Sequence, residues 1–356
     1  MEHYKGKDPT KEDQEKEVVV ITGSSGLLGS SLISALAPKY RIVGLDLIPP
    51  SHAQFQAEFV VFDLADENSI LAAMERIRYA YGNKIASVIH LAAYYEFAQR
   101  DSPQYHEINV AGTEKFMSHL QDFELEQIQF SSSNLIYRPS RPGLKIDEDC
   151  QVEANWGYPE SKVLTEELIR NQRNGIPAVF LRIAGVYTDY GHSIPITQQI
   201  KRIHEKELLS HFYSGDTDHG DVFVHLDDVV RAIEKALEKR RELPEEIALN
   251  IGEPESPTYQ ELQDSIGNLL HGKDWETYEL PKSLAKAGAW VRDLVGDPFI
   301  KPWMIDRAGS HYELDIGRAR EHLDWQPRHR ILDTLPTIIG NLKADPQLWY
   351  NNHNLE

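Results

Sequence analysis

The chain has 356 residues, enough to bury the core of one large domain or of two interleaved ones, and its composition is that of a globular protein. Its formal net charge of −19 argues against binding to nucleic acid or to anionic membrane surfaces, because both depend on clustered Lys and Arg. Cys150 is the single cysteine, which excludes an intramolecular disulfide, and no Cys/His cluster has the spacing of a metal site.

The first segment, residues 1–16, is highly charged and lacks the apolar core of a signal peptide. No later run approaches the length needed to span a membrane. We therefore expect a flexible tail without chemistry, followed by a protein that works in the reducing cytoplasm.

From residue 17 onward, apolar β-branched runs alternate with helical segments, which is the pattern of a parallel sheet covered by helices. The predicted strands cover residues 18–22, 41–46, 59–63, 87–93, 127–133, 178–184 and 247–252. About seven such strands suit an α/β fold with a doubly wound parallel sheet of the Rossmann type, which binds its cofactor at the carboxyl ends of the strands.

Two later segments are less regular and richer in Pro, Trp and mixed polarity: residues 188–220 and 253–356. We predict that they form a smaller, C-terminal substrate-binding region over the carboxyl edge of the sheet. Residues 17–187 plus 221–252 would then form the dinucleotide-binding domain.

Three glycines, Gly23, Gly26 and Gly29, lie between the first predicted strand and the helix that follows it. The first glycine permits a tight turn, the second lets a pyrophosphate approach the backbone, and the third lets the helix pack against the strand. The free N–H groups at the start of the helix would face the phosphates. This context predicts a dinucleotide site rather than a plain turn.

Two acids follow the next strands. Asp46 ends the second predicted strand, where a carboxylate accepts hydrogen bonds from ribose hydroxyls and repels a 2′-phosphate, so NAD is favoured over NADP. Asp63 and Leu64 close the third predicted strand and are expected to border the adenine. The alternative for both acids is an ordinary place in a turn.

A Tyr and a Lys, Tyr158 and Lys162, stand four positions apart in a segment with helical periodicity, so both can lie on one helix face. A nearby ammonium stabilises a phenolate and lowers the pKa of the tyrosine toward the range of a general base. Pro159 requires the helix to begin close to Tyr158, with Asn155 as the candidate N-cap.

The same spacing recurs at Tyr278 and Lys282. Pro281 stands between these two residues and no cofactor motif surrounds them, so we do not expect this second pair to be catalytic.

Seven motifs in this order resemble the extended short-chain dehydrogenase/reductases, and more narrowly the NAD-dependent epimerase/dehydratase family. They are TGSSGLLG (22–29), FDL (62–64), HLAA (90–93), NVAGT (109–113), SSSNLIY (131–137), YPESK (158–162) and LRIAGVY (181–187). The resemblance continues close to the C-terminus. It implies NAD as the cofactor and a small-molecule substrate, and, because family members often dimerise, a homodimer.

The resemblance also implies a catalytic site made of Ser133, Tyr158 and Lys162. Ser133 would orient the substrate oxygen, Tyr158 would exchange the proton, and Lys162 would also hold the nicotinamide ribose. The cofactor-binding positions that we predict are Gly23, Ser25, Gly26, Leu27, Gly29, Asp46, Asp63, Leu64, Leu91, Ala92, Ala93, Asn109, Tyr158, Lys162 and Ile183.

Other polar residues have structural explanations. Asn109 matches a family position that bonds main chain or a water of the proton relay, and a helix cap is the equal alternative. His90 lies within an apolar strand and is expected to be a hydrogen-bonded core histidine. His225 and Asp228 are expected to be structural.

Departures from the family narrow the reaction and the substrate. Dehydratases of the family carry an Asp-Glu pair where this chain has Asn134 and Leu135, which disfavours elimination. Members that bind nucleotide sugars hold the diphosphate with an Asn and an Arg where this chain has Gly185 and Asp221. A sugar-like ring and another secondary alcohol therefore both stay open as substrates.

Two functional hypotheses follow. In the first, the protein is an enzyme that moves a hydride between NAD and a secondary alcohol or ketone, as a net dehydrogenase or as an epimerase. In the second, it binds the dinucleotide without turnover, as a redox sensor or scaffold. The intact set of Ser133, Tyr158 and Lys162 favours the enzyme, since a sensor has no need of it.

Overall fold

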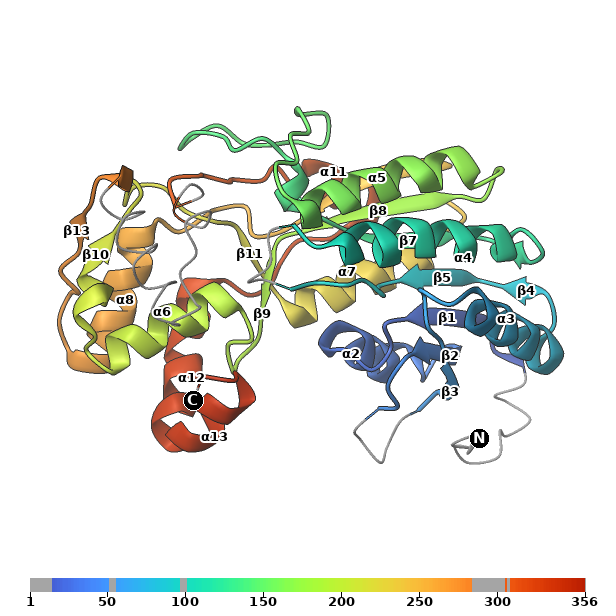
Figure 1. Ribbon diagram of the computed structural model, residues 1–356, viewed down its shortest axis with the longest axis horizontal. Helices are drawn as coiled ribbons and strands as arrows, with labels where there is room; N and C mark the ends of the chain where they lie inside the picture. The colour runs from blue at the N-terminus through green and yellow to red at the C-terminus, as the bar shows by residue number, and fades with distance from the viewer. Residues whose placement is uncertain (1–14, 51–55, 97–100, 284–304, 306–307, 356) are drawn as a thin grey trace.

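The computed structural model describes residues 15–50, 56–96, 101–283, 305 and 308–355. Its centre is a seven-stranded parallel sheet with the strand order β12-β8-β7-β5-β1-β2-β3 (Figure 1). The strands are β1 (Val18–Thr22), β2 (Arg41–Asp46), β3 (Glu58–Val61), β5 (Ser87–His90), β7 (Ile128–Ser133), β8 (Ala178–Ile183) and β12 (Glu246–Ile251). This arrangement confirms the predicted fold class and the existence of all seven predicted strands.

The largest difference in strand bounds is at β5, which ends at His90 and not at residue 93. The strand ends because the Leu91 N–H is shared between the carbonyl and the side-chain oxygen of Thr22, at 3.2 and 3.1 Å, and the Ala92 N–H donates to that side-chain oxygen at 3.0 Å. The chain therefore leaves the sheet at the edge where a cofactor would lie.

Helices cover both faces of the sheet, which explains why the strands are apolar without alternation. On one face, α2 (Leu27–Leu36) and α7 (Leu226–Glu238) pack against Val19 and Ile21 of β1. On the other, α3 (Glu67–Tyr81), α4 (Thr113–Leu120) and α5 (Gly157–Gln172) share a core with Val18 and Val20. Helix α11 (Gly317–Leu323) joins the first of these cores.

A third core lies away from β1, β2 and β3, at the left of Figure 1. Its helices are α6 (Ile194–His204), α8 (Tyr259–His271), α12 (Ile331–Ala344) and α13 (Pro346–Asn352). Two small parallel pairs accompany them: β9 (Gly185–Tyr187) with β11 (Phe223–His225), and β10 (Phe212–Tyr213) with β13 (Tyr278–Glu279). We propose that the four helices and the pair of β10 with β13, which lie within residues 188–220 and 253–356, form the substrate-binding region.

Helix α5 begins at Gly157, so Tyr158 lies inside its first turn, as the position of Pro159 predicts. The predicted N-cap was wrong, because Trp156 and not Asn155 holds that position, with φ −158° and ψ 164° and no side-chain cap bond. The Trp156 carbonyl accepts the N–H of Glu160 at 3.1 Å. Pro159 has no N–H, which leaves one donor fewer for a cap to satisfy.

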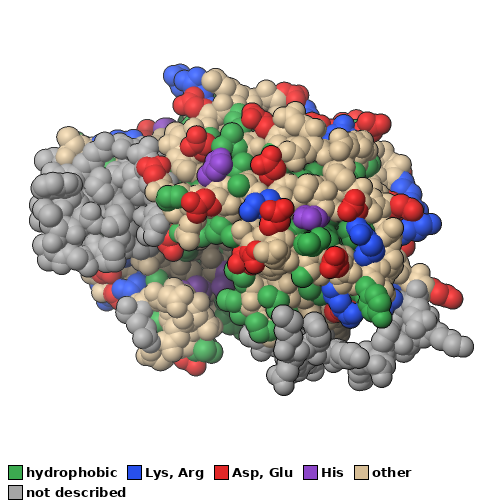
Figure 2. All heavy atoms as spheres, turned by 45° about the vertical axis from the view of Figure 1, so that its right-hand side comes forward, with side chains coloured by type: hydrophobic (Ala, Val, Ile, Leu, Met, Phe, Trp, Pro, Cys, Tyr) green, Lys and Arg blue, Asp and Glu red, His purple; other side chains and the backbone are tan. Residues whose placement is uncertain are grey.

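Acidic and basic side chains are interspersed on the face drawn in Figure 2, where Lys and Arg stand singly or in small groups among Asp and Glu. Within the described residues, no helix combines the length and the apolar character that a membrane crossing requires.

Candidate active site

The turn after β1 has the backbone geometry of a phosphate-binding loop. A Cβ on Gly29 would come within 2.2 Å of the Gly23 carbonyl oxygen, and one on Gly23 within 2.9 Å of the Ala92 nitrogen. Gly23 also has a φ of +70°. A Cβ on Gly26 would meet only the Gly23 oxygen, at 3.4 Å, so the protein's own packing does not demand glycine there. An approaching pyrophosphate would, and the turn therefore fits a dinucleotide.

Asp46 lies beside this turn. Its Oδ2 accepts the backbone N–H of Ser25 at 2.9 Å, and the Ser25 hydroxyl donates to the Ile48 carbonyl at 2.7 Å. The carboxylate is thus held at the end of β2 next to the glycine turn, where a ribose diol would meet it. Leu27 begins α2 and is 43% exposed at this edge.

Asp63 and Leu64 follow β3. One carboxylate oxygen of Asp63 accepts the N–H of Ala65 at 2.8 Å, so this acid does form a turn, with its second oxygen outside that bond. Leu64 is buried against Gly112, where a Cβ would lie 2.5 Å from the Leu64 carbonyl oxygen. The adenine contact stays a prediction for both residues.

The three predicted catalytic residues meet at the carboxyl end of β7. Ser133 ends that strand beside Ile183 of β8, and its Oγ accepts the N–H of Leu135 at 3.2 Å. The Lys162 ammonium donates to the Ser131 carbonyl at 2.7 Å and lies 5.6 Å from the centre of the Tyr158 ring. The early start of α5 therefore brings both side chains of the pair to the same strand end.

Burial shifts the pKa values of the pair in opposite directions. It raises the pKa of Tyr158 well above its ordinary value, and the neighbouring Tyr95 and Tyr105 add to this, while a hydrogen bond from Ser133 opposes it. It lowers the pKa of Lys162 to about 7, against the pull of the Glu166 carboxylate. Both shifts disfavour the charged forms, so a phenolate at Tyr158 depends on the stabilisation that Ser133 and a protonated Lys162 provide.

An aromatic wall surrounds Tyr158, and the sequence analysis missed it. It consists of Tyr95, Tyr105 and Trp156, whose ring centres lie 4.6, 6.1 and 5.7 Å from that of Tyr158. Tyr95 is 46% exposed, so part of the wall is open to a ligand. The signal for it was the pair of tyrosines directly after the HLAA motif.

Asn109 holds the backbone of Tyr94, the residue directly before Tyr95 of this wall. It lies inside a π-helical turn, η1 (Tyr105–Gly112), and its Oδ1 accepts the N–H of Tyr94 at 2.6 Å. Its Nδ2 lies 3.1 Å from the Tyr94 carbonyl oxygen and 3.0 Å from the Ser161 hydroxyl. Of the two alternatives, the bond to main chain is confirmed and the helix cap is wrong.

His90 is the hydrogen-bonded core histidine that its strand predicts. Its Nδ1 lies 2.7 Å from the Thr22 hydroxyl and its Nε2 lies 2.9 Å from the Thr113 hydroxyl. Burial, with the nearby Lys162 ammonium, lowers the pKa of His90 to about 3.

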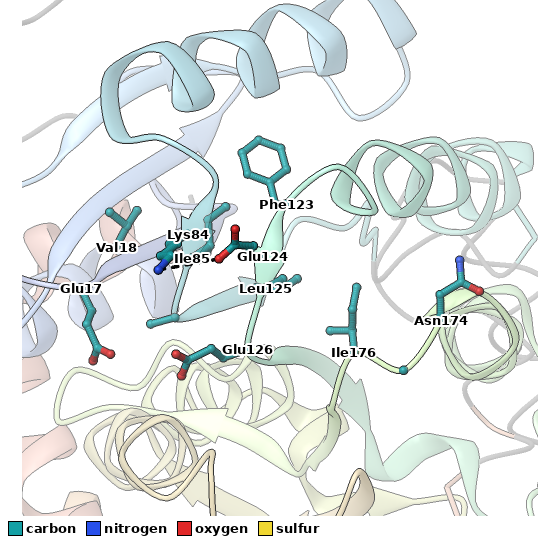
Figure 3. A pocket seen from close by; sticks show the side chains of 12 residues that line it. Glu17, Val18, Lys84, Ile85, Phe123, Glu124, Leu125, Glu126, Asn174 and Ile176 are labelled. Carbon is teal, nitrogen blue, oxygen red and sulfur yellow. Dashed lines mark ion pairs between the residues drawn. The ribbon is translucent and has the colours of Figure 1, made fainter.

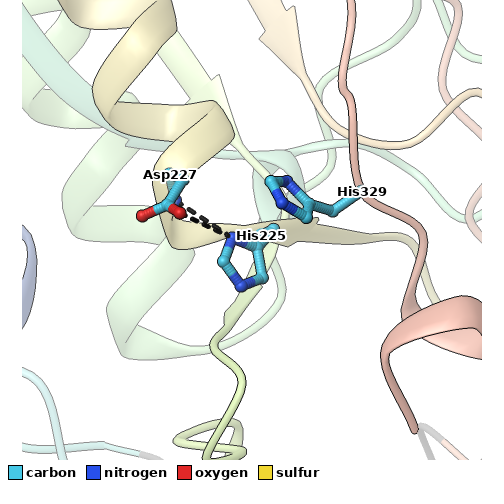
Figure 4. Close-up of side chains that lie close together, drawn as sticks. All are labelled: His225, Asp227 and His329. Atoms are coloured by element: carbon cyan, nitrogen blue, oxygen red, sulfur yellow. Dashed lines mark hydrogen bonds and ion pairs between the residues drawn. The ribbon is translucent and has the colours of Figure 1, made fainter. Parts of the chain in front are cut away.

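His225 and Asp228 tie the C-terminal segment to α7. His225 Nδ1 caps the helix by accepting the N–H of Asp227 at 3.2 Å, and Asp228 accepts the backbone N–H and the Nδ1–H of His329. His225, Asp227 and His329 lie close together (Figure 4). Because one nitrogen of each ring is committed and the rings stack at 4.1 Å, we assign the group to packing.

Two other features lie apart from the site. A cavity of about 560 Å³, drawn in Figure 3, is lined by residues that precede β1, β5, β7 and β8, among them Glu17, Lys84 and Glu126. It therefore lies at the amino ends of the strands, opposite the cofactor turn. Tyr278, of the second Tyr-Lys pair, lies on β13, exposed and bonded to Glu276.

Comparison with known proteins gives a consistent result. The family model described as the NAD dependent epimerase/dehydratase family matches residues 19–252. The chain is 26% identical over 342 residues to a UDP-glucose 4-epimerase of Rhizobium leguminosarum bv. trifolii, covering 90% of this chain and 95% of that protein. It is 24% identical to a dTDP-4-dehydro-6-deoxyglucose reductase of Escherichia coli, with 93% and 99% covered.

Solved structures share the fold. A UDP-glucuronic acid 4-epimerase from Bacillus cereus, in complex with UDP-glucuronic acid and NAD, superposes with a TM-score of 0.70 at 21% identity. The match covers 92% of this chain and 99% of that one.

Proposed function

Since the chain belongs to the NAD-dependent epimerase/dehydratase family, which confirms NAD as the predicted cofactor, we propose that it moves a hydride at a secondary alcohol or ketone carbon of a sugar-like ring. The observation that carries this proposal is the meeting of Ser133, Tyr158 and Lys162 at one strand end, beside the open aromatic wall. A dinucleotide-binding scaffold without turnover has no use for that set.

We assign the proton to Tyr158. As the substrate C–O bond becomes a carbonyl, the Tyr158 phenolate takes the hydroxyl proton, and it returns that proton in the reverse direction. Lys162 offsets the phenolate charge when it is protonated, and Ser133 donates to the substrate oxygen and orients it. NAD, held by the glycine turn and Asp46, would supply the acceptor for the hydride that leaves the same carbon.

We leave elimination outside the proposed reaction. A dehydratase needs its own acid and base next to the active-site hydroxyl. Asn134 and Leu135 follow Ser133 directly, and neither side chain can exchange a proton in the ordinary pH range. This supports epimerisation or net oxidation.

For the substrate, we infer a ring that packs against Tyr95. The two curated relatives named above are named for nucleotide-sugar substrates, which supports a sugar. Asp221, an exposed acid just before β11, disfavours a substrate with a diphosphate, because the two negative groups would repel each other. Free sugars therefore belong in the substrate screen beside the UDP-sugars.

The test begins with purified native protein and identification of the nucleotide that copurifies with it. Turnover is then measured by NADH absorbance and by analysis of the epimeric product, with UDP-glucose, UDP-galactose and free sugars as probes. We expect Tyr158→Phe to bind NAD as the native protein does and to lose about 10²–10⁴-fold in turnover.

Tyr278→Phe is the matched control, because it makes the same change on an exposed tyrosine, and it should turn over normally. Equal turnover in Tyr158→Phe would contradict the assigned role. NAD binding by a native protein that turns over no ring alcohol would favour the scaffold.

A further inference from the structure

A buried row of polar groups starts at the cofactor edge of the sheet. The side-chain oxygen of Thr22 accepts hydrogen bonds from the N–H groups of Leu91 and Ala92. The hydrogen of this hydroxyl therefore donates to His90 Nδ1, 2.7 Å away. Nδ1 is then the acceptor nitrogen of a neutral ring. A backbone N–H can only donate a hydrogen bond. The two backbone donors therefore decide that Thr22 donates to His90 and that His90 Nδ1 accepts.

The row continues on the other side of the ring. With Nδ1 as acceptor, the ring proton lies on Nε2, which donates to the Thr113 oxygen at 2.9 Å. The Thr113 hydroxyl in turn donates to the Asn109 carbonyl at 2.6 Å. Both threonines and the histidine are buried, so water does not replace these bonds. The row therefore passes from β1 and β5 to the helices behind them.

The far end of the row reaches the catalytic helix. The Asn109 side chain lies 3.0 Å from the Ser161 hydroxyl, and that hydroxyl donates to the Tyr158 carbonyl at 2.7 Å. Thr165, one turn further along α5, lies 3.1 Å from the Asn109 carbonyl oxygen. One set of hydrogen bonds thus joins the turn after β5 to the helix that carries Tyr158.

The imidazole can serve both neighbours only while it is neutral, because a protonated ring has no acceptor. The low pKa of His90 keeps it neutral at physiological pH. Phe116 and Phe130 pack on the ring at 5.4 and 5.8 Å and restrict its rotation.

We propose that His90 is a positioning residue of the cofactor site: its neutral imidazole couples the Thr22-bound backbone turn, which borders NAD, to Thr113 and through it to the catalytic helix. The inference rests on the proposed function for the location of the cofactor. It assigns His90 no contact with NAD or substrate, and it predicts that a change at Thr113, behind the ring, alters NAD binding.

The test is the dissociation constant of NAD, measured by calorimetry on the full-length protein without substrate. Thr113→Val keeps the shape of the side chain but leaves His90 Nε2–H without an acceptor, and it should weaken NAD binding about tenfold. Thr113→Ser restores the hydroxyl and should bind within about twofold of the native protein.

Thr334→Val is the matched control, because Thr334 is also buried and donates to a main-chain carbonyl, that of Arg330 at the start of α12, and has no bond to the row that contains His90. Equal NAD affinity in Thr113→Val and Thr334→Val would overturn the inference while the proposed function stands. A native protein that binds no NAD would overturn both.

A measurement on the native protein covers the case in which Thr113→Val does not fold. Nitrogen-15 NMR of His90 should show the Nε2–H tautomer, unchanged between about pH 5 and pH 8. If the ring is protonated on Nδ1, or titrates within this interval, Nδ1 cannot accept the hydrogen bond from Thr22 throughout. Either result would overturn the inference.

Discussion

Lys162 shows at the scale of one residue what the burial of a charged group costs in stability. Its ammonium is buried and donates a hydrogen bond to the Ser131 carbonyl. Burial of this charge away from water lowers the stability of the folded protein. The pKa falls from 10.5 to about 7 for this reason. A lysine that releases its proton near neutral pH can follow the protonation state of the tyrosine beside it.

Replacement of Lys162 by Met should therefore abolish turnover yet raise the free energy of unfolding of the NAD-free protein by roughly 1–3 kcal/mol at pH 7. The way in which stability changes with pH follows from the lowered pKa of Lys162 in the folded protein. Between about pH 7 and 10.5 the unfolded chain holds a proton that the folded protein has released, so the native protein gains stability as pH rises.

The advantage of Lys162→Met should accordingly shrink as the pH rises from about 7 to 10 in denaturant unfolding. Lys84→Met, a change of an exposed lysine, should show no such trend. An advantage that stays constant or grows with pH would contradict the buried, neutralising state of Lys162.

Asp46 gives a second test at this scale. Asp46→Asn keeps an oxygen that can accept the Ser25 N–H and removes only the charge. We expect the preference for NAD over NADP, measured by calorimetry, to fall by at least roughly tenfold, because like-charge juxtaposition costs several kcal/mol. Asp63→Asn, at the end of the next strand, should leave the preference unchanged. An unaltered ratio in Asp46→Asn would refute a role for its charge.

At the scale of elements, the turn between β1 and α2 separates what packing requires from what a ligand requires. A Cβ on Gly23 or on Gly29 would clash with the protein's own backbone, whereas a Cβ on Gly26 would make one ordinary contact, 3.4 Å from the Gly23 oxygen. The start of α2 has no side-chain cap, so its first N–H groups remain for a phosphate. Packing thus requires glycine at two positions of this stretch, and we propose that the cofactor requires it at the third.

Alanine at Gly29 should push α2 off the turn and cost about 1–3 kcal/mol of stability together with NAD binding. Alanine at Gly26 should leave the denaturation midpoint close to native and still weaken NAD binding, since its methyl occupies the approach of the pyrophosphate.

Gly340→Ala controls for the effect of alanine in a helix. Apart from its chain neighbours and the nearby backbone of its own helix, no atom lies within 4 Å of the added carbon, and the variant should gain roughly 0.5–1 kcal/mol of stability. Equal losses of stability at Gly26 and Gly29 would show that both glycines serve packing alone.

At the scale of the whole molecule, a buried acid, Asp228, helps to fasten the C-terminal chain to the sheet domain. Asp228 accepts the backbone N–H groups of Arg328 and His329, both at 2.9 Å, and it also pairs with Arg231. Trp325 donates its indole N–H to the Asp228 carbonyl at 2.9 Å. The segment that leads into α12 is therefore bound to the first turn of α7.

Asp228→Ala should lower the free energy of unfolding by about 3 kcal/mol, because it leaves several partly buried donors, among them the Arg231 guanidinium, without an acceptor. Asp227→Ala, at the exposed neighbour in the same helix turn, should cost less than about 1 kcal/mol. Chemical denaturation followed by tryptophan fluorescence measures both. Similar losses in the two variants would mean that Asp228 does not fasten the segment.

Local patterns in the sequence were sufficient for the seven strands, for the glycine turn and for the start of α5 near Tyr158. Each of these follows from neighbours in the chain: a buried parallel strand is continuously apolar, a turn that meets a helix needs glycine, and proline is tolerated only in the first turn. The family and NAD as cofactor followed from the order of the motifs.

The partners of side chains were decided only by the tertiary structure. Thr22 and His90 are 68 positions apart, and Asn109 and Ser161 are 52 apart, so no local pattern indicates that they bond. The ring contact between Tyr95 and Tyr158 likewise joins residues that are far apart in the sequence. The N-cap of α5 also differed from the predicted Asn155, because the buried Trp156 holds that position. Sequence period fixes which face a residue occupies, whereas contact across the sheet depends on how the strands are ordered.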